Sequence, residues 1–250
     1  MKLLPAILCV SFFFTPASRP ADLPSGETIL NQSVAKSGGV AAYAKVKTVV
    51  LSGTVEMAGH NISGPISIYQ EGDKSYSVTE LPGIGKVEEG CDGETAWENN
   101  SLQGARIKEG AEKAATMRAA KVTLLSSWRD YYKSVRTLGA EDLDGKPAWK
   151  VELTPKDGAP EIFYFDQKSA LLVRMTQTLP TALGDIPVDV TLSDYRTVDG
   201  IQTAFVMTQK AMSQTLNMRF DKIAYNAPIE PGRFTLPPPV KALRDKMKQP

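Results

Sequence analysis

The residues that could do chemistry are few, and their spacing does not favour it. The only histidine, His60, stands between Gly59 and Asn61, in a sequence typical of a turn. A zinc site or a Ser-His-Asp nucleophile arrangement would have to use this histidine together with nearby thiolates or carboxylates. Its immediate neighbours offer neither, so we interpret His60 as a solvated turn residue.

Two further motifs fail at their key positions. The run Asp142–Gly145 is similar to a calcium-binding loop, but Ala140 and Val151 occupy the first and twelfth ligand positions, where oxygen ligands are needed. Gly83 and Gly85 lack the third glycine and the helix start of a dinucleotide-binding loop. We interpret these stretches as a hairpin turn and a loop.

Paired carboxylates are the remaining enzymatic alternative. Glu88 and Glu89 are adjacent, and Glu71 lies close to Asp73 in the chain. A glycosidase needs two carboxyl groups facing each other at about 5 to 9.5 Å, and such a pair could only be formed between distant strands. The sequence therefore predicts no enzyme, no cofactor and no metal site, with hydrolysis kept as the alternative.

What remains is an inventory of apolar residues on expected strands and one expected helix. Methionines gather late in the chain, and their flexible side chains suit surfaces that adapt to variable apolar ligands. For any single residue, ordinary core packing is the alternative interpretation. The candidate ligand-binding residues are Leu51, Val55, Ile66, Ile68, Trp97, Trp128, Trp149, Met175, Val190, Met207 and Met218.

These residues need a sheet to position them. From Val46 onward apolar residues recur at every second position, as in a half-buried antiparallel strand. Asp-Gly pairs at Asp92, Asp144, Asp157 and Asp199 predict tight turns between such runs. The pattern predicts about ten to eleven strands in sequential hairpins. A curved sheet this wide cannot bury one whole face on one or two helices, so a ligand-binding groove is expected.

Two helices are expected beside the strands. Ser25 stands where an N-cap would begin a helix near Gly26. The stretch from Ile107 to about Lys133 has helical periodicity, and Gly110 could delay its start. This second helix could be a core helix or a movable lid over a cavity. From Pro228 we expect an extended strap, and residues 237–250 are expected to be a polar, flexible tail.

The first seventeen residues, 1–17, have the layout of a secretory signal peptide, with an apolar run too short to span a bilayer. Cleavage is expected after Ala17, with Ala21 as the alternative. Cys9 would leave with the leader, although lipidation of Cys9 is a weaker alternative. Cys91 would then be the only thiol, and burial is its expected fate. Residues 24–236 are expected to form a single exported domain.

The charge balance excludes some partners. The chain carries 29 Lys and Arg residues against 28 Asp and Glu residues, a formal net charge of +1. Loss of Lys2 with the leader leaves the chain near neutrality. This predicts no large basic field for nucleic acid or for a membrane surface. We expect a monomer.

Several short motifs together resemble a known group, the outer-membrane lipoprotein-sorting family of bacteria. This family includes the LolA and LolB carriers and relatives such as RseB and LppX. The likeness spans about Thr28 to Tyr225. The motifs that carry it are Leu51–Thr54, Asp92–Trp97, Tyr164–Asp166, Leu172–Arg174 and Asp194–Ile201.

The resemblance implies an α+β fold, in which an unclosed antiparallel β half-barrel covers an N-terminal and a mid-chain helix. It also implies a hydrophobic cavity for acyl chains and no catalytic residue. Arg174 follows the strand that matches the position of the carriers' gating arginine. The function expected is a periplasmic carrier or sensor that binds lipid or acylated protein cargo. The alternative is a non-catalytic interaction module that binds envelope proteins and regulates an envelope pathway.

Overall fold

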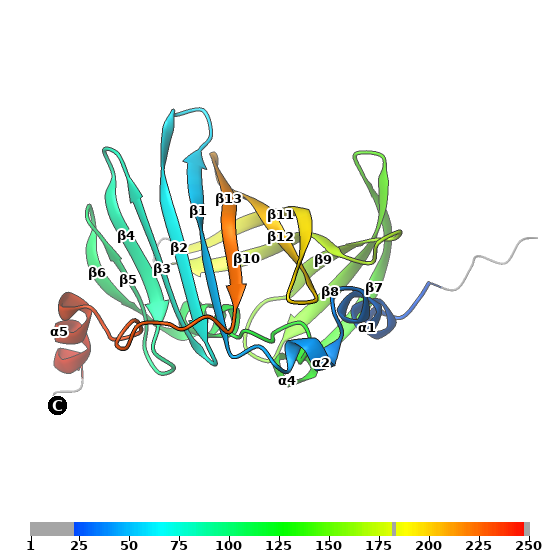
Figure 1. Ribbon diagram of the computed structural model, residues 1–250, viewed down its shortest axis with the longest axis horizontal. Helices are drawn as coiled ribbons and strands as arrows, with labels where there is room; N and C mark the ends of the chain where they lie inside the picture. The colour runs from blue at the N-terminus through cyan, green and yellow to red at the C-terminus, as the bar shows by residue number, and fades with distance from the viewer. Residues whose placement is uncertain (1–22, 182–183, 248–250) are drawn as a thin grey trace, which may run out of the picture.

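The computed structural model describes residues 23–181 and 184–247 (Figure 1). The expected leader and Cys9 lie outside these residues. All strands of the described part belong to one antiparallel sheet of thirteen strands. The strands are β1 (Thr48–Met57), β2 (Ile62–Glu71), β3 (Lys74–Leu81), β4 (Gly85–Cys91), β5 (Ala96–Asn100), β6 (Gly104–Lys108), β7 (Tyr132–Leu143), β8 (Lys146–Pro155), β9 (Glu161–Asp166), β10 (Leu172–Thr181), β11 (Gly184–Val198), β12 (Ile201–Ala211) and β13 (Gln214–Tyr225).

The sheet is an unclosed half-barrel. Its strand order is β6-β5-β4-β3-β2-β1-β13-β12-β11-β10-β9-β8-β7, so every strand pairs with its sequence neighbour except where β1 meets β13. The sheet is curved but not closed, and its two edge strands, β6 and β7, lie at opposite ends of the molecule (Figure 1). The fold class expected from the sequence is confirmed, although thirteen strands exceed the ten or eleven expected.

The β1–β13 pair joins the two ends of the chain at the middle of the sheet. The register shifts between Ser52 and Gly53, which marks a β-bulge. A Cβ atom at Gly53 would lie 2.0 Å from the backbone oxygen of Arg219, so only glycine fits this close approach. A bulge bends its strand and increases the local twist of the sheet.

Helix α1 (Gly26–Lys36) begins where the sequence predicts. The hydroxyl of Ser25 accepts a hydrogen bond from the backbone N–H of Thr28 at 3.1 Å, which satisfies one of the free donors at the helix start. The helix buries Ile29 and Leu30, each 1% exposed, against the strands near β7. The short helix α2 (Val40–Tyr43) follows and leads into β1.

The mid-chain helix is shorter than expected. The helical part begins at Gly110, the later start that the sequence allowed, and Ile107 lies in β6. The prediction of one continuous helix is wrong, because the helical part divides into α3 (Gly110–Ala119) and α4 (Trp128–Tyr131). Between them the chain runs through turns that include Thr123 and Ser126, whose hydroxyl donates to the Thr123 carbonyl oxygen at 3.0 Å. Side chains that bond nearby backbone in this way compete with helix formation.

The C-terminal segment also differs from expectation. Its strap crosses the lower ends of β1 to β3 on the viewer's side (Figure 1) and leads into helix α5 (Pro238–Met247). The expectation of a flexible tail from residue 237 is therefore wrong. Two prolines suit the first helical turn, and Val240, which is 0% exposed, anchors the helix on the sheet. None of the helices in the described residues is long and apolar enough to cross a membrane.

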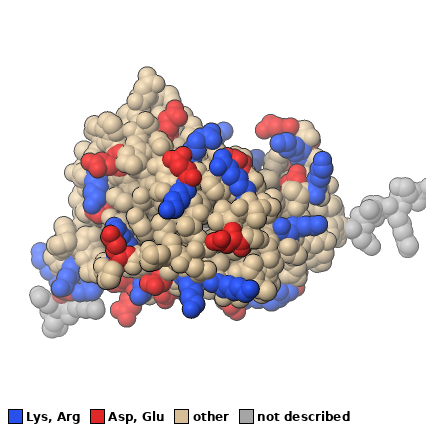
Figure 2. Space-filling model, in the orientation of Figure 1, with Lys and Arg blue, Asp and Glu red and all other residues tan. Residues whose placement is uncertain are grey.

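The sheet has two faces with different coverings. We call the face that carries Leu51 and Val55 the inner face, and α1, α3 and α4 pack on it. We call the face that carries Tyr76 and Trp97 the outer face, which the strap and α5 cover in part. Figure 2 shows Lys and Arg interspersed with Asp and Glu in this view, with no broad field of one sign.

Candidate ligand-binding face and its bridging helix

Most of the candidate residues from the central strands meet on the inner face. Val55 of β1 lies opposite Met218 of β13, and Met218 lies opposite Met207 of β12. Leu51 lies opposite Ile68 of β2. These residues belong to one apolar cluster that also contains Ile66 and Phe220. Alternation along paired strands brings them together, as the sequence predicts.

A second apolar cluster continues the inner face towards β7. Trp149 of β8 lies opposite Phe165 of β9, and Met175 of β10 lies opposite Phe163. Trp128 of α4 packs into the same cluster and is 5% exposed. Val190 pairs with Met175 and so points to the same side. Ten of the eleven candidate residues therefore share the inner face or its covering helix, and whether they bind a ligand stays a prediction.

The two clusters adjoin where β11 meets β12. Leu192 belongs to the second cluster, and it pairs with Met207 of the first. Several of the apolar side chains here, including Met175, Met207 and Leu51, are only partly buried. Across the strands that carry these two clusters, the inner face is thus a continuous apolar surface that the helices cover incompletely.

Trp97 lies on the other face, which corrects the expectation that it lines the same space. Its neighbour Ala96 packs on the inner face with Cys91, so alternation sends Trp97 outward. There it packs with Tyr76, Leu236 and Val240. The residue that the sequence analysis assigned to ligand binding is a buried anchor for the strap and α5.

Helix α3 bridges the two halves of the sheet. It packs against β4 and β5 on one side and against β10 on the other. At the β6 side, Arg106 donates to Glu112 of α3 at 2.6 and 2.7 Å and to Glu98 of β5 at 2.7 Å. The hydrogen bonds from Arg106 hold the pKa of Glu112 below its usual value, against the opposing effect of burial.

Lys108 forms a second link at this side. Its ammonium group donates to Glu89 of β4 at 2.8 Å and to the hydroxyl of Thr116 in α3 at 3.3 Å. The Lys108 side chain is 7% exposed, while that of Glu89 is 48% exposed. A buried lysine needs such partners, because an unpaired ammonium in this position would lose its hydration without compensation.

Arg118 fastens the far end of α3. It donates to Glu161 of β9 at 2.6 Å and to the carboxylate of Asp157 at 2.9 Å. The hydroxyl of Tyr132 donates to the other oxygen of Glu161 at 2.8 Å. Burial acts to lower the pKa of Arg118, but the neighbouring carboxylates outweigh it and the pKa is raised.

A small apolar contact lies under the C-terminal end of α3. Cys91 is 0% exposed, and it packs with Ala96 of β5 and with Met117 and Ala120 near the end of α3. The thiol donates to the carbonyl oxygen of Asp73 at 3.3 Å. The expected burial of Cys91 is confirmed, and both alternatives for the helix, core element and movable lid, fit a short helix held by charged contacts at each end.

In the described residues no group of three or more His, Cys, Asp and Glu side chains could hold a metal ion. His60 is exposed in the turn between β1 and β2, as expected. The residues that the sequence analysis missed are the charged tethers of α3, which join positions far apart in the chain.

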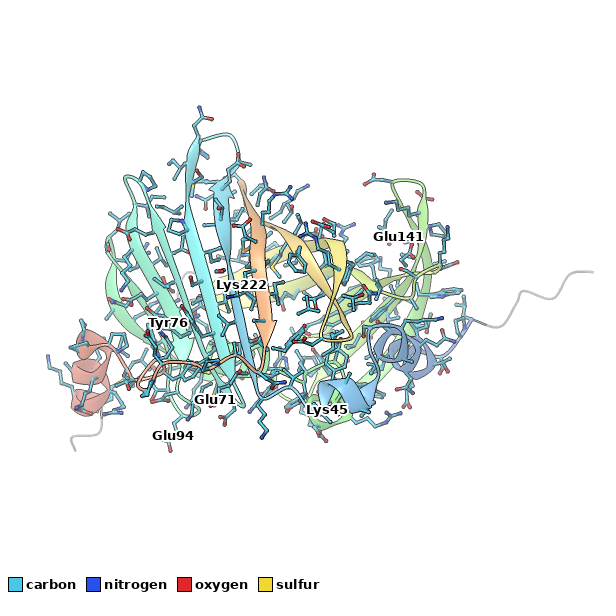
Figure 3. All side chains as sticks on the ribbon, viewed as in Figure 1. Lys45, Glu71, Tyr76, Glu94, Glu141 and Lys222 are labelled. Carbon is cyan, nitrogen blue, oxygen red and sulfur yellow. The ribbon has the colours of Figure 1, made fainter. Side chains whose placement is uncertain are left out.

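Two cavities large enough for a ligand lie beside α3 and beneath the strap. A cavity of about 430 Å³ lies between α3 and α4, with Met117 and Tyr131 in its lining. Another, of about 640 Å³, lies between the strap, α5 and the β2–β3 turn. Figure 3 shows Glu71 and Glu94 at the lower rim near this region, and Tyr76 above it. Cavities of this size fall within the range of ligand sites.

No protein-family model matches the sequence, and no curated protein matches it. Solved structures do match the fold. A DUF1329 family protein from Desulfovibrio piger aligns over 84% of this chain and 96% of its own, with 14% identity and a TM-score of 0.55. A LolA superfamily protein from Nitrosomonas europaea aligns over 86% of this chain and 99% of its own, with 10% identity and a TM-score of 0.53.

A putative outer membrane lipoprotein-sorting protein domain from Vibrio parahaemolyticus gives the same result. It aligns over 84% of this chain and 96% of its own, with 12% identity and a TM-score of 0.52. At these identities the likeness concerns the fold, and it covers nearly the whole of each solved chain. Together with the unclosed sheet and its inner-face helices, it shows that the chain has the LolA-like fold of the lipoprotein-sorting proteins.

Proposed function

We propose that the protein binds a lipid or the acyl chain of a lipoprotein on its inner face, as a carrier or sensor in the periplasm. The observation that carries the proposal is the apolar surface of the inner face, on which Leu51, Met175 and Met207 remain partly exposed. Residues 1–17, with their leader-like pattern, support the periplasmic location. The proposal assigns no catalytic role to any residue and needs no cofactor.

The energetics favour a flexible chain as the ligand. Each methylene group that leaves water contributes about 0.8 kcal/mol, so about ten buried methylenes stabilise the complex by roughly 8 kcal/mol. Val55, Ile66 and Val190 are already buried, so an acyl chain has to separate side chains that now touch. Methionines at Met175 and Met207 can change rotamer at little cost and accommodate it.

Native mass spectrometry tests the proposal. The mature protein is purified from its periplasm, its mass is measured, and bound molecules are extracted into organic solvent and identified. A stoichiometric lipid adduct is the expected result. A mass without adduct, together with no uptake of added phospholipid or lipopeptide, would overturn the proposal.

Substitutions on the inner face locate the binding surface. Met207→Asp and Leu51→Asp place a charge among apolar side chains, and each is expected to reduce the bound lipid while the helices stay folded. Met212→Asp is the matched control, because Met212 lies at the β12–β13 turn and is 82% exposed. Equal lipid retention by folded Met207→Asp and Met212→Asp proteins would remove Met207 from the binding surface.

A non-catalytic interaction module is the second candidate. A cavity of about 470 Å³ has Ile162, Pro187 and Met212 in its lining, on strands β9 and β11 and the β12–β13 turn. Partly exposed apolar residues of this kind favour contact with another protein. This candidate predicts that Met212→Asp weakens partner binding and that the purified protein carries no lipid.

A further inference from the structure

The cavity between α3 and α4 connects charged groups with the apolar inner face. It measures about 430 Å³. Met117 in its lining packs with Cys91 and Ala96, and Tyr131 packs against the cluster that contains Trp128. The apolar side of the cavity is therefore formed by residues that also belong to the inner-face clusters.

The charged side of the cavity is mainly basic. Four cations line it, against two carboxylates: Lys113, Arg118, Lys121 and Lys156, with Asp130 and Asp157. Arg118 is held by two carboxylates, Asp157 at 2.9 Å and Glu161, which lies outside the lining, at 2.6 Å. Three lysines and Asp130 remain in the lining.

Two of these lysines are available to a ligand. Lys121 lies 3.8 Å from a carboxylate oxygen of Asp73, whereas in the described residues no ion pair joins Lys113 or Lys156 to a carboxylate. Lys156 is exposed, and Lys113 is partly exposed on α3. An ammonium group in such a position can bind an anion as a mobile point charge.

The other large cavity does not share this property. Its lining beneath the strap holds three cations and three carboxylates: Lys74, Lys241 and Arg244, with Glu71, Asp92 and Glu230. Of these two cavities, only the α3–α4 cavity has more cations than carboxylates in its lining.

Resting on the proposed function, we propose that the α3–α4 cavity binds the anionic head group of an amphiphile whose acyl chain lies on the inner face. Lys113 and Lys156 contact the head group, and Met117 and Tyr131 contact the first part of the chain. The chemistry recognised is an anion, carboxylate or phosphate, attached to a long alkyl chain. A neutral acyl chain binds the inner face without using the lysines.

The test compares probes that separate head from chain. Oleate carries chain and anion, monoolein carries the same chain with a neutral head, and inorganic phosphate carries an anion alone. Their dissociation constants are measured for the wild-type protein and for the Lys113→Gln/Lys156→Gln variant. Lys45→Gln/Lys222→Gln is the matched control, because both lysines lie outside the cavity lining, one beside α2 and one on β13 (Figure 3).

The cavity variant is expected to bind oleate about fivefold to tenfold more weakly and monoolein unchanged. The control variant binds both probes like the wild type, and phosphate alone competes only weakly with oleate. For the wild-type protein, raising the salt concentration weakens oleate binding and leaves monoolein binding unchanged. The salt series does not depend on the folding of any variant.

Two results would overturn the inference in distinguishable ways. If monoolein binds and oleate binding responds neither to the two lysines nor to salt, the head-group site is wrong while the proposed function stands. If neither oleate nor monoolein binds the wild-type protein, the proposed function fails and the head-group site fails with it.

Discussion

Arg118 of α3 donates to Glu161 of β9 across 2.6 Å, and the side chains are 9% and 7% exposed. An ion pair this fully buried is a strong contact while both partners are present. Removing one partner destabilises the fold, because the other charge stays buried without compensation. It fixes the end of the bridging helix to the half of the sheet that carries the second apolar cluster. The position of α3 over the inner face therefore depends on this pair.

Arg118→Met is expected to lower the free energy of unfolding by about 3 to 5 kcal/mol, because the carboxylate of Glu161 stays buried without its cation. Urea denaturation followed by tryptophan fluorescence measures the change. Arg136→Met is the control, since Arg136 pairs with Glu152 while 69% exposed, and it should cost at most about 1 kcal/mol. Equal losses for the two variants would show that the buried pair has no special weight.

Removing both partners should restore stability in part. In an Arg118→Met/Glu161→Leu protein no charge of the pair remains buried, although Tyr132 loses its acceptor. We expect this variant to be more stable than Arg118→Met alone. A double variant that loses the sum of the two single effects would argue against coupling between Arg118 and Glu161.

The thiol of Cys91 can report movement of α3. In a Cys9→Ser protein Cys91 is the only thiol, and it is covered by Met117 and Ala120. Arg118→Met is expected to speed its reaction with a thiol reagent under native conditions, because a loosened helix uncovers it. The rate should depend weakly on urea, since local opening exposes little surface. A steep urea dependence would mean that labelling needs global unfolding.

Lowering the pH should weaken the contacts that join α3 to β6. The pKa of Glu112 lies below its ordinary value of 4.5, so the Arg106–Glu112 contact stabilises the fold above about pH 4.5 and loses this contribution as the pH falls through the lower folded value. Glu112→Gln is expected to lower Tm at pH 7 and to flatten the loss of Tm between pH 5 and pH 3. Arg106→Gln should likewise reduce the loss of Tm between pH 5 and pH 3. If neither variant changes the slope of Tm against pH, the assignment of this pH dependence to the Arg106–Glu112 contact is wrong.

Trp97→Ala separates stability from ligand binding. The indole is 1% exposed on the outer face, and its loss should destabilise the fold by about 3 to 5 kcal/mol. Because the inner face is untouched, the folded protein should retain as much lipid as the wild type, measured as lipid per folded molecule. Loss of lipid from the folded variant would place Trp97 in the binding surface after all.

Alternation predicted the inner face where one side of a strand is polar. Along β1, Val55 is buried while Thr54 and Glu56 are exposed, so the side that faces the core can be read from the residues. The same pattern placed Met218 and Met207 correctly beside it. The antiparallel sheet followed from these strands and their turns, whereas the unclosed half-barrel was implied by the resemblance to the lipoprotein-sorting family.

The pattern failed where a strand has no polar side. In β5, Ala96 and Trp97 are both buried, with exposures of 0% and 1%, so nothing in the strand itself says which side faces the helices. The pairing of Gly90 with Trp97 settles it, and pairing is a property of the assembled sheet. The pair of Arg118 and Glu161 was unpredictable for the same reason, since 43 positions separate them and only the path of α3 brings them together.

The strand β7 has a consequence for the behaviour of the protein at high concentration. It is a free edge of twelve residues, but its register against β8 shifts twice, between Tyr132 and Ser134 and between Thr137 and Gly139. Exposed Lys133 and Arg136 lie along it, and the opposite edge, β6, has only five residues. Bulged, charged or very short edges are poor templates for an incoming strand. The sheet can therefore stay open without growing into fibrils.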